Sequence, residues 1–252
     1  MAPKRKMQLL YGKHWFERLA DHMGEAYLKY AFTKGTKQEV EFLMSALGLK
    51  PGMNLLDVGC GPGRHAYYFA ELGVNVHGID ISQTFIDIAS AGAPRGATFE
   101  RADAREMSYH QQYDAVISLC QGAFGLAGDP HRPVSSEDPD GEILCRMAEA
   151  LVPSGKMAMT AFSSYFQIRY LEESDTFFAA QGINNEKTQI RNVAGEEIEE
   201  ELWTSCFTPR ELRLLAERAG LSVLSMWSVT PGKYREAPLS INEPEILVIA
   251  ER

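Results

Sequence analysis

Residues 53 to 65 restrict the fold more than any other stretch of the chain. They begin with a short apolar run, Asn54 to Val58, of the kind found in strands buried on both faces of a parallel sheet. Three glycines at alternate positions, from Gly59 to Gly63, follow this run, and residues 64 to 72 have apolar residues at helical spacing. The stretch therefore predicts a strand, a tight turn and a helix. Glycine lets a ligand lie against the backbone and a helix N-terminus presents free N–H groups, so we expect a nucleotide-type site there.

Two details of this turn indicate the kind of ligand. The glycine spacing is G-x-G-x-G, whereas the dinucleotide-binding turn has G-x-G-x-x-G. In addition, the carboxylate of Asp57 lies within the end of the strand, where it would repel a pyrophosphate and attract a cationic amino group. The run Leu56-Asp57-Val58-Gly59-Cys60-Gly61-Pro62-Gly63 resembles motif I of the class I, Rossmann-like S-adenosylmethionine-dependent methyltransferases.

The rest of the chain has the rhythm of a doubly wound α/β fold. Further strands are predicted at 74–79, 97–101, 114–119 and 156–162, with intervening helices at 82–91 and 141–151. The last two predicted strands, 221–229 and 245–250, must be antiparallel, because the loop between them is too short and too proline-rich for a crossover helix. We expect a mostly parallel seven-stranded sheet with a C-terminal antiparallel hairpin. Such a hairpin belongs to the methyltransferase fold that the glycine turn resembles.

Two segments lie outside this rhythm. Residues 8–32 and 36–48 predict N-terminal helices, and we expect residues 1–50 to form a helical cap before a methyltransferase domain at 51–252. Two runs, 188–193 and 198–203, flank Ala194-Gly195 and predict a small hairpin inserted after strand five. We expect this insertion, within residues 163–206, to act as a lid or as a subunit contact, the latter in a homodimer.

The resemblance also implies which residues hold the donor. Asp57 would face its α-amino group, and Asp80, at the end of the second strand, would accept its ribose hydroxyls. Asp103 would meet the adenine amine, and Phe85 would lie against the adenine ring. Each has a simpler interpretation, because Asp80 could cap a helix, Phe85 could be a core residue and Asp103 could lie in a solvated turn. The predicted donor-binding residues are Asp57, Gly59, Cys60, Gly61, Gly63, Asp80, Ile81, Phe85, Asp103, Ala104, Leu119, Cys120 and Gln121.

The acceptor is expected to be a small molecule methylated on nitrogen or oxygen. Residues 118–125 lack the N-P-P-Y or D-P-P-Y motif of family members that methylate nucleobases or glutamine, which argues against those acceptors. His131 and His14 are candidates for a general base, a surface position being the simpler interpretation of both. The predicted acceptor-binding residues are Tyr11, Trp15, Tyr30, Phe124, Tyr165 and Arg169.

Composition argues against several other classes of protein. The net charge of −9 gives no reason to expect nucleic acid or an anionic membrane as a partner. The four cysteines have neither metal-site nor disulfide spacing, so we expect no metal and a reducing, cytoplasmic location. No apolar run is long enough for a transmembrane helix or a signal peptide. Two alternatives stay open: a non-catalytic protein that binds S-adenosylmethionine, and an NAD(P)-dependent oxidoreductase.

Overall fold

The computed structural model describes residues 14–120, 122–126 and 138–252. Within them, the strands form one ten-stranded sheet with the order β3-β2-β1-β4-β5-β8-β7-β6, in which β5 also pairs with β10, and β10 with β9. Five central strands are parallel: β1 (Asn54–Val58), β2 (Asn75–Asp80), β3 (Ala97–Arg101), β4 (Tyr113–Ser118) and β5 (Leu151–Ser163).

The seven-stranded sheet predicted from the sequence is confirmed as the part of this larger sheet that β1 to β5, β9 and β10 form. Strand β10 (Glu245–Glu251) runs antiparallel to both β5 and β9 (Ser222–Val229), so the C-terminal hairpin closes one edge of the sheet. The strand order reverses between β1 and β4, and the carboxyl ends on either side of this switch point form a crevice for a ligand.

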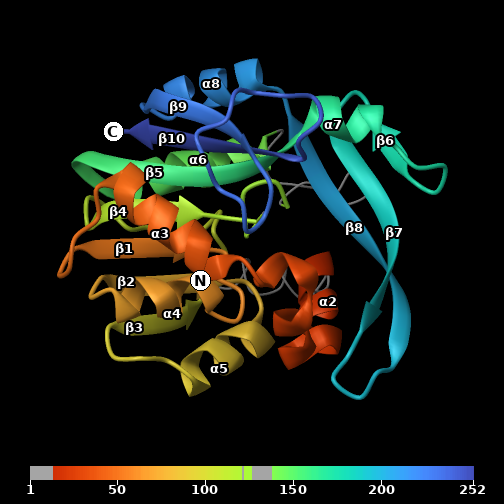
Figure 1. Cartoon of the computed structure of the whole chain (residues 1–252), viewed down its shortest axis with the longest axis horizontal. Coiled ribbons are helices and arrows are strands. Elements are labelled where there is room, and N and C mark those ends of the chain that lie inside the picture. The colour runs from red at the N-terminus through yellow and green to blue at the C-terminus, as the bar shows by residue number, and fades with distance from the viewer. Residues whose placement is uncertain (1–13, 121, 127–137) are drawn as a thin grey trace, which may run out of the picture.

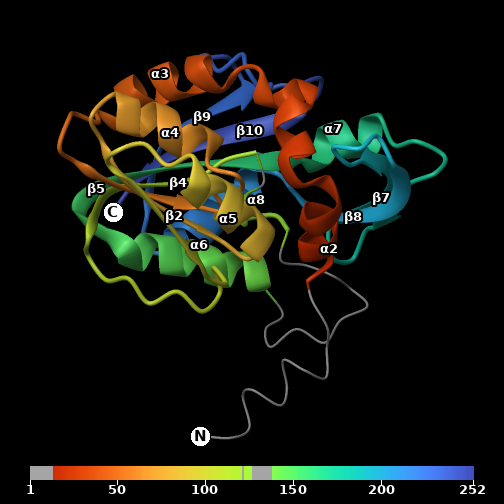
Figure 2. The same ribbon diagram turned by 90° about the horizontal axis from the view of Figure 1, so that it is seen from below.

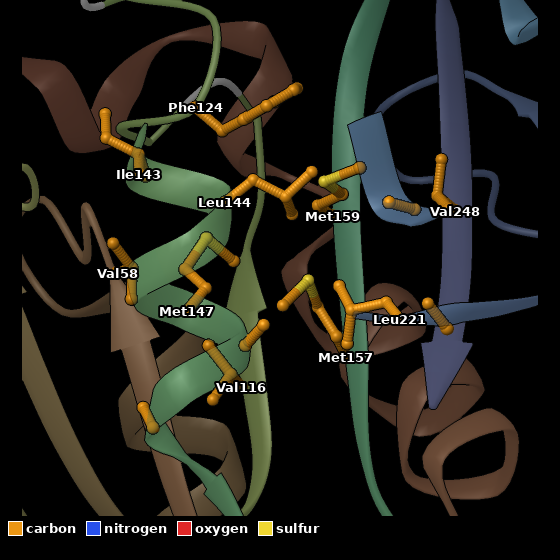
Figure 3. Close-up of a cluster of buried hydrophobic side chains, with 14 of the residues drawn as sticks. Val58, Val116, Phe124, Ile143, Leu144, Met147, Met157, Met159, Leu221 and Val248 are labelled. Atoms are coloured by element: carbon orange, nitrogen blue, oxygen red, sulfur yellow. The ribbon is translucent and has the colours of Figure 1, made fainter. Parts of the chain in front are cut away.

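Helices cover both faces of this sheet (Figure 2). On one face, α6 (Pro139–Ala150) and α8 (Pro209–Arg218) enclose the larger part of the core, where Leu144 and Met147 lie against Met157 and Met159 of β5 (Figure 3). On the other face lie α3 (Thr36–Leu47) and α4 (Arg64–Glu71), with α5 (Gln83–Ala91) beside β2 and β3.

The predicted helix ends have a clear local cause. The side chain of Ser82 accepts the N–H of Phe85 at the start of α5, and Thr208 forms a capping box with Glu211 at the start of α8. Gly48 ends α3 in the left-handed conformation. Helix α3 is part of the core, because its Val40 and Leu43 are buried against the sheet.

The hairpin in the insertion after β5 is longer than the sequence predicts. The insertion contains α7 (Ser164–Arg169), β6 (Thr176–Phe178), and a long hairpin of β7 (Ile183–Arg191) and β8 (Glu197–Phe207). Strand β8 joins the main sheet through only two residue pairs, Phe162 with Cys206 and Ser163 with Phe207. The hairpin stands beyond the carboxyl ends of the parallel strands (Figure 1).

The N-terminal segment lies between the sheet and this hairpin (Figures 1 and 2). It consists of α2 (Trp15–Met23) and two 3₁₀ helices, η1 (Gly24–Lys29) and η2 (Ala31–Thr33), instead of one long helix. No helix in the described part of the chain is long and apolar enough to span a bilayer.

Helix α2 makes polar contacts on both of its sides. Toward the sheet, Glu17 contacts Arg101 (2.8 Å) and Asp21 contacts Thr84 (2.6 Å). Toward the hairpin, Arg18 contacts Glu200 (2.9 Å) and His22 contacts the carbonyl of Glu196 (3.1 Å).

Candidate functional site

The three glycines of the turn between β1 and α4 lie in different surroundings, so each is needed for a different reason. A side chain on Gly59 would lie 2.0 Å from the carbonyl carbon of Gly122, so this glycine permits two loops to touch. Gly63 is enclosed too, but by side chains and not by backbone atoms. A side chain on Gly61, by contrast, would meet no atom closer than the ring of Phe85 at 4.0 Å. Gly61 therefore borders open space, as a backbone that binds a ligand should.

Asp80 ties this turn to the end of β2. Its Oδ2 accepts the N–H of Gly61 at 2.9 Å, and its Oδ1 accepts the N–H of Ser82 at 2.8 Å. Burial raises the pKa of Asp80 to about 6, although these two hydrogen bonds lower it. Asp80 thus orders the turn and the start of α5, and both of its oxygens retain a lone pair for a ligand hydroxyl.

Asp57 is a buried carboxylate whose Oδ2 has no hydrogen-bond partner among the described residues. The side chain is 2 % exposed. Burial raises the pKa of Asp57, Arg64 opposes this effect and the nearby Asp80 adds to it, so that the pKa is about 7. An orphaned buried carboxylate of this kind requires a donor, and an ammonium group supplies both the donor and the compensating charge.

A small cavity of about 40 Å³ opens beside the turn. Four of the predicted donor-binding residues line it, Asp80 and Ile81 together with Asp103 and Ala104. Burial raises the pKa of Asp103, but hydrogen bonds from Arg105 outweigh this effect and lower it. Asp103 is therefore an ionised acceptor at this end of the site.

A larger cavity of about 350 Å³ continues from the turn toward the hairpin. Its floor is formed by residues 59–62 with Leu119 and Cys120, next to the end of β4. Aromatic side chains of the N-terminal segment cover it, and Phe162 of β5 closes one side. The hairpin forms the opposite wall. The aromatic residues of the N-terminal cover are Trp15, Phe16, Tyr27 and Tyr30, and the hairpin contributes Glu186, Thr188, Gln189, Ile190, Leu202 and Thr204.

A buried ionic network supports the floor of this cavity, and the sequence analysis missed it. The carboxylate of Glu39, which is fully buried, accepts hydrogen bonds from Arg64 (2.9 Å), His65 (2.7 Å) and the backbone of Gly232 (2.6 Å). These donors outweigh burial and lower the pKa of Glu39 to about 2, whereas burial lowers the pKa of His65 to about 4. Arg64 also donates to the sulfur of Cys120 at 2.8 Å. Glu39, His65 and Cys120 cluster as metal ligands do, but the guanidinium of Arg64 already supplies the positive charge among them.

The structure brings some of the predicted acceptor residues to the cavity and leaves others outside it. Trp15 and Tyr30 line it. Phe124 instead stacks on Phe207 in the core, with ring centroids 4.8 Å apart. Tyr165 and Arg169 are exposed on α7 outside the cavity, which Gln167 of the same helix lines.

Of the remaining predicted site residues, one lines a cavity, one lies in the core and three lie outside the described residues. His14 caps α2 and lines the small cavity instead of the larger one. Phe85 is completely buried and lines neither cavity, and its ring packs against Tyr27 with centroids 4.9 Å apart. Tyr11, Gln121 and His131 lie outside the described residues.

Fold and site together define a class of protein. The parallel sheet has a glycine turn at its switch point, an open backbone at Gly61, and two buried acids placed for hydroxyl and amino groups. A Rossmann-like domain with these features binds a nucleotide-type ligand at the carboxyl ends of its strands.

Comparisons with known proteins agree with this class. A family model described as a methyltransferase domain matches residues 55–155. The chain is 24 % identical over 220 residues to a cypemycin N-terminal methyltransferase of Streptomyces, covering 80 % of this chain and 84 % of that protein. It is 32 % identical over 178 residues to phosphoethanolamine N-methyltransferase 2 of Caenorhabditis elegans, covering 68 % of this chain but only 38 % of that enzyme. The CcbJ methyltransferase of Streptomyces caelestis has the same fold, with a TM-score of 0.75, 17 % identity and coverage of 94 % and 97 % of the two chains.

The chain belongs to the class I S-adenosylmethionine-dependent methyltransferases. Its methyl donor is S-adenosylmethionine, as in the solved neighbours. The orphaned Oδ2 of Asp57 and the open space at Gly61 fit the amino-acid end of that donor.

Donor affinity is expected to depend on pH through Asp57. Because an ammonium group binds the ionised carboxylate, binding at low pH must displace a proton from a group whose pKa is about 7. We expect the Kd for S-adenosylhomocysteine to be lowest near pH 8 and to rise roughly tenfold per pH unit below about pH 7. Isothermal titration in buffers of different ionisation enthalpy measures both the Kd and the proton released. A Kd that does not change between pH 6 and pH 8 would contradict this assignment.

Proposed function

We propose that the protein transfers a methyl group from S-adenosylmethionine to a nitrogen atom of a small molecule bound in the larger cavity. The observation that carries this proposal is the aromatic enclosure of that cavity directly in front of the glycine turn, by Trp15, Tyr27, Tyr30 and Phe162. The donor supplies an activated methyl group when bound. The chain has to align the acceptor with it and exclude water, and an enclosed aromatic site does both.

The available bases favour nitrogen over oxygen as the acceptor atom. A hydroxyl of high pKa usually needs a general base, whereas an uncharged amine needs none in the transfer step. His65 is the one imidazole among the described residues that line the larger cavity, and it is bound to Glu39 with its pKa lowered to about 4. His14 lies at the small cavity instead. The two curated relatives described above are also N-methyltransferases by name.

Within this proposal, the chain's own residues have separate roles. Asp57 would hold the amino group of the donor and Asp80 its ribose, while the backbone at Gly61 would lie along it. Asp103 would receive the adenine. The N-terminal segment would act as the cover of the site, and the β7–β8 hairpin as the wall that meets the acceptor.

We further propose that the enzyme is cytoplasmic and has no nucleic-acid partner. The four cysteines are all unpaired thiols, which a reducing compartment maintains. The net charge of −9 disfavours binding to a polyanion.

A transfer assay tests the acceptor atom. We expect labelled methyl groups from S-adenosylmethionine to appear on amines and to be absent from the alcohols of the same carbon skeleton, with fragmentation mass spectrometry placing the methyl on nitrogen. Asp80→Ala is the control, since it should abolish transfer to every acceptor by weakening the donor site. Methylation of the alcohols in preference to the amines would refute the nitrogen assignment.

A further inference from the structure

One face of the β7–β8 hairpin is turned toward the larger cavity. Side chains alternate along a strand, and the pairing of Glu186 with Leu202 and of Asn184 with Thr204 fixes which residues share that face. Glu186, Leu202 and Thr204 all line the cavity. The next position toward the turn on this face, Thr188, lines it as well. The opposite face carries Lys187 and Glu201, which do not line it, although Gln189, nearer the turn on that face, does.

Glu186 is the acidic residue of this face that has no cation beside it. Among the described residues none forms an ion pair with Glu186. Arg64 is bound to Glu39, and Arg18 is bound to Glu200. Burial raises the pKa of Glu186, and the nearby carboxylates of Asp175 and Glu172 raise it further. Three carboxylates therefore lie near one another here, and Glu186, which is exposed at the rim of the cavity, has no cation beside it within the described part of the chain.

Two deeply buried polar atoms beside this wall also have no partner. The amide oxygen of Asn184 has no hydrogen-bond donor, and this residue is 1 % exposed. The indole N–H of Trp15, which lines the cavity at 2 % exposure, has no acceptor. Buried polar groups are nearly always hydrogen-bonded in folded proteins, so a missing partner indicates a ligand or bound water. Asn184 itself does not line the cavity, whereas Trp15 does, so the indole N–H is the unpartnered group that a ligand in the cavity can meet.

We infer that the acceptor carries a second, positively charged amino group, which Glu186 binds at the rim of the cavity while the reacting nitrogen lies near the glycine turn. The inference rests on the proposed transfer to nitrogen and specifies the class of acceptor. An ammonium nitrogen has no lone pair with which to attack a methyl group, so the nitrogen held as a cation by Glu186 is not the one that reacts. The acceptor class is then a diamine or a larger molecule with two basic nitrogens. Trp15, which lines the cavity, adds a donor for an oxygen atom of the acceptor.

Matched diamines and amino alcohols test this inference. The probes are 1,4-bis(aminomethyl)benzene and 4-(aminomethyl)benzyl alcohol, together with linear diamines and amino alcohols of equal length. We expect the diamines to have a kcat/KM roughly ten- to a hundredfold higher, the range of a charge-assisted hydrogen bond, with most of the difference in KM. Glu186→Gln should remove this advantage. Glu201→Gln makes the same change on the opposite face of the hairpin and should retain it, and both variants should unfold at the temperature of the wild type.

The outcomes separate this inference from the proposed function. Equal kcat/KM values for diamines and amino alcohols, or equal effects of Glu186→Gln and Glu201→Gln, would overturn the second-cation site while leaving transfer to nitrogen intact. Titration of the same diamines into the protein loaded with S-adenosylhomocysteine gives a readout that does not depend on transfer. If they bind in a Glu186-dependent manner but receive no methyl on nitrogen, the proposed acceptor atom fails and the cation site stands. Diamines that neither bind nor react overturn the inference.

Discussion

Asp57→Asn is expected to make the ligand-free protein more stable at pH 8 and to weaken donor binding by a hundredfold or more. The folded protein holds the pKa of this carboxyl at about 7, whereas an unfolded chain leaves it near its model value of 3.8. A raised pKa means that folding favours the protonated acid. The destabilisation caused by the charge is therefore absent below about pH 4, grows as the pH rises, and is complete above about pH 7, where it is on the order of 4 kcal/mol. Asparagine carries no charge to bury and recovers part of this.

Denaturant unfolding at pH 5 and pH 8 measures the stability change, and titration with S-adenosylhomocysteine measures the affinity. The variant should differ from the wild type more at pH 8 than at pH 5. Asp87→Asn, an exposed position on α5, is the matched control and should change neither quantity. A variant that binds the donor normally would show that Asp57 does not hold its amino group.

Glu39→Gln is expected to destabilise the protein by about 3–5 kcal/mol, because it leaves the buried guanidinium of Arg64 without its counter-charge. It also replaces one of two accepting oxygens with an amide N–H₂, since one oxygen of Glu39 accepts from His65 and the other from the backbone of Gly232. Thermal unfolding should shift downward by about 10 °C for a chain of this length. Since Arg64 and His65 begin the helix after the glycine turn, donor affinity should fall as well.

Glu41→Gln provides the control on the same helix. Glu41 is 61 % exposed and lies 3.8 Å from Lys37, a surface pair that contributes little. Its replacement should change stability by less than about 0.5 kcal/mol. Equal stability of the two variants would mean that the Glu39 network is not important for folding.

The donor half of the protein could be read from the sequence because its signals are local. Asp57 and the three glycines are contiguous, and Asp80 ends the next strand, so strand order alone brings them to one crevice. The helix caps at Ser82 and Thr208 are equally local, each involving a residue three positions away.

The parts that sequence analysis missed depend on contacts between distant segments. Glu39 reads as an ordinary helix residue until Gly232, 193 positions later, is seen to donate to it. Phe124 looks like a cavity residue beside the donor, but Phe207 of the insertion attracts it into the core. Glu186 lies in a strand with polar residues on both faces, and only the pairing of β7 with β8 shows which face meets the cavity.

Because few residue pairs join the hairpin to the main sheet, the donor site and the proposed acceptor wall can change separately in evolution. The residues proposed to bind the donor lie at the carboxyl ends of the parallel strands. The proposed acceptor wall pairs with β5 only through Phe162 and Ser163, and side-chain contacts such as Arg18 with Glu200 and Ser205 with Asp140 hold it in place. An exchange of residues 183–205 between related enzymes would therefore alter which molecule is methylated without disturbing the machinery that supplies the methyl group. The hairpin is the natural graft for redirecting this enzyme to new acceptors.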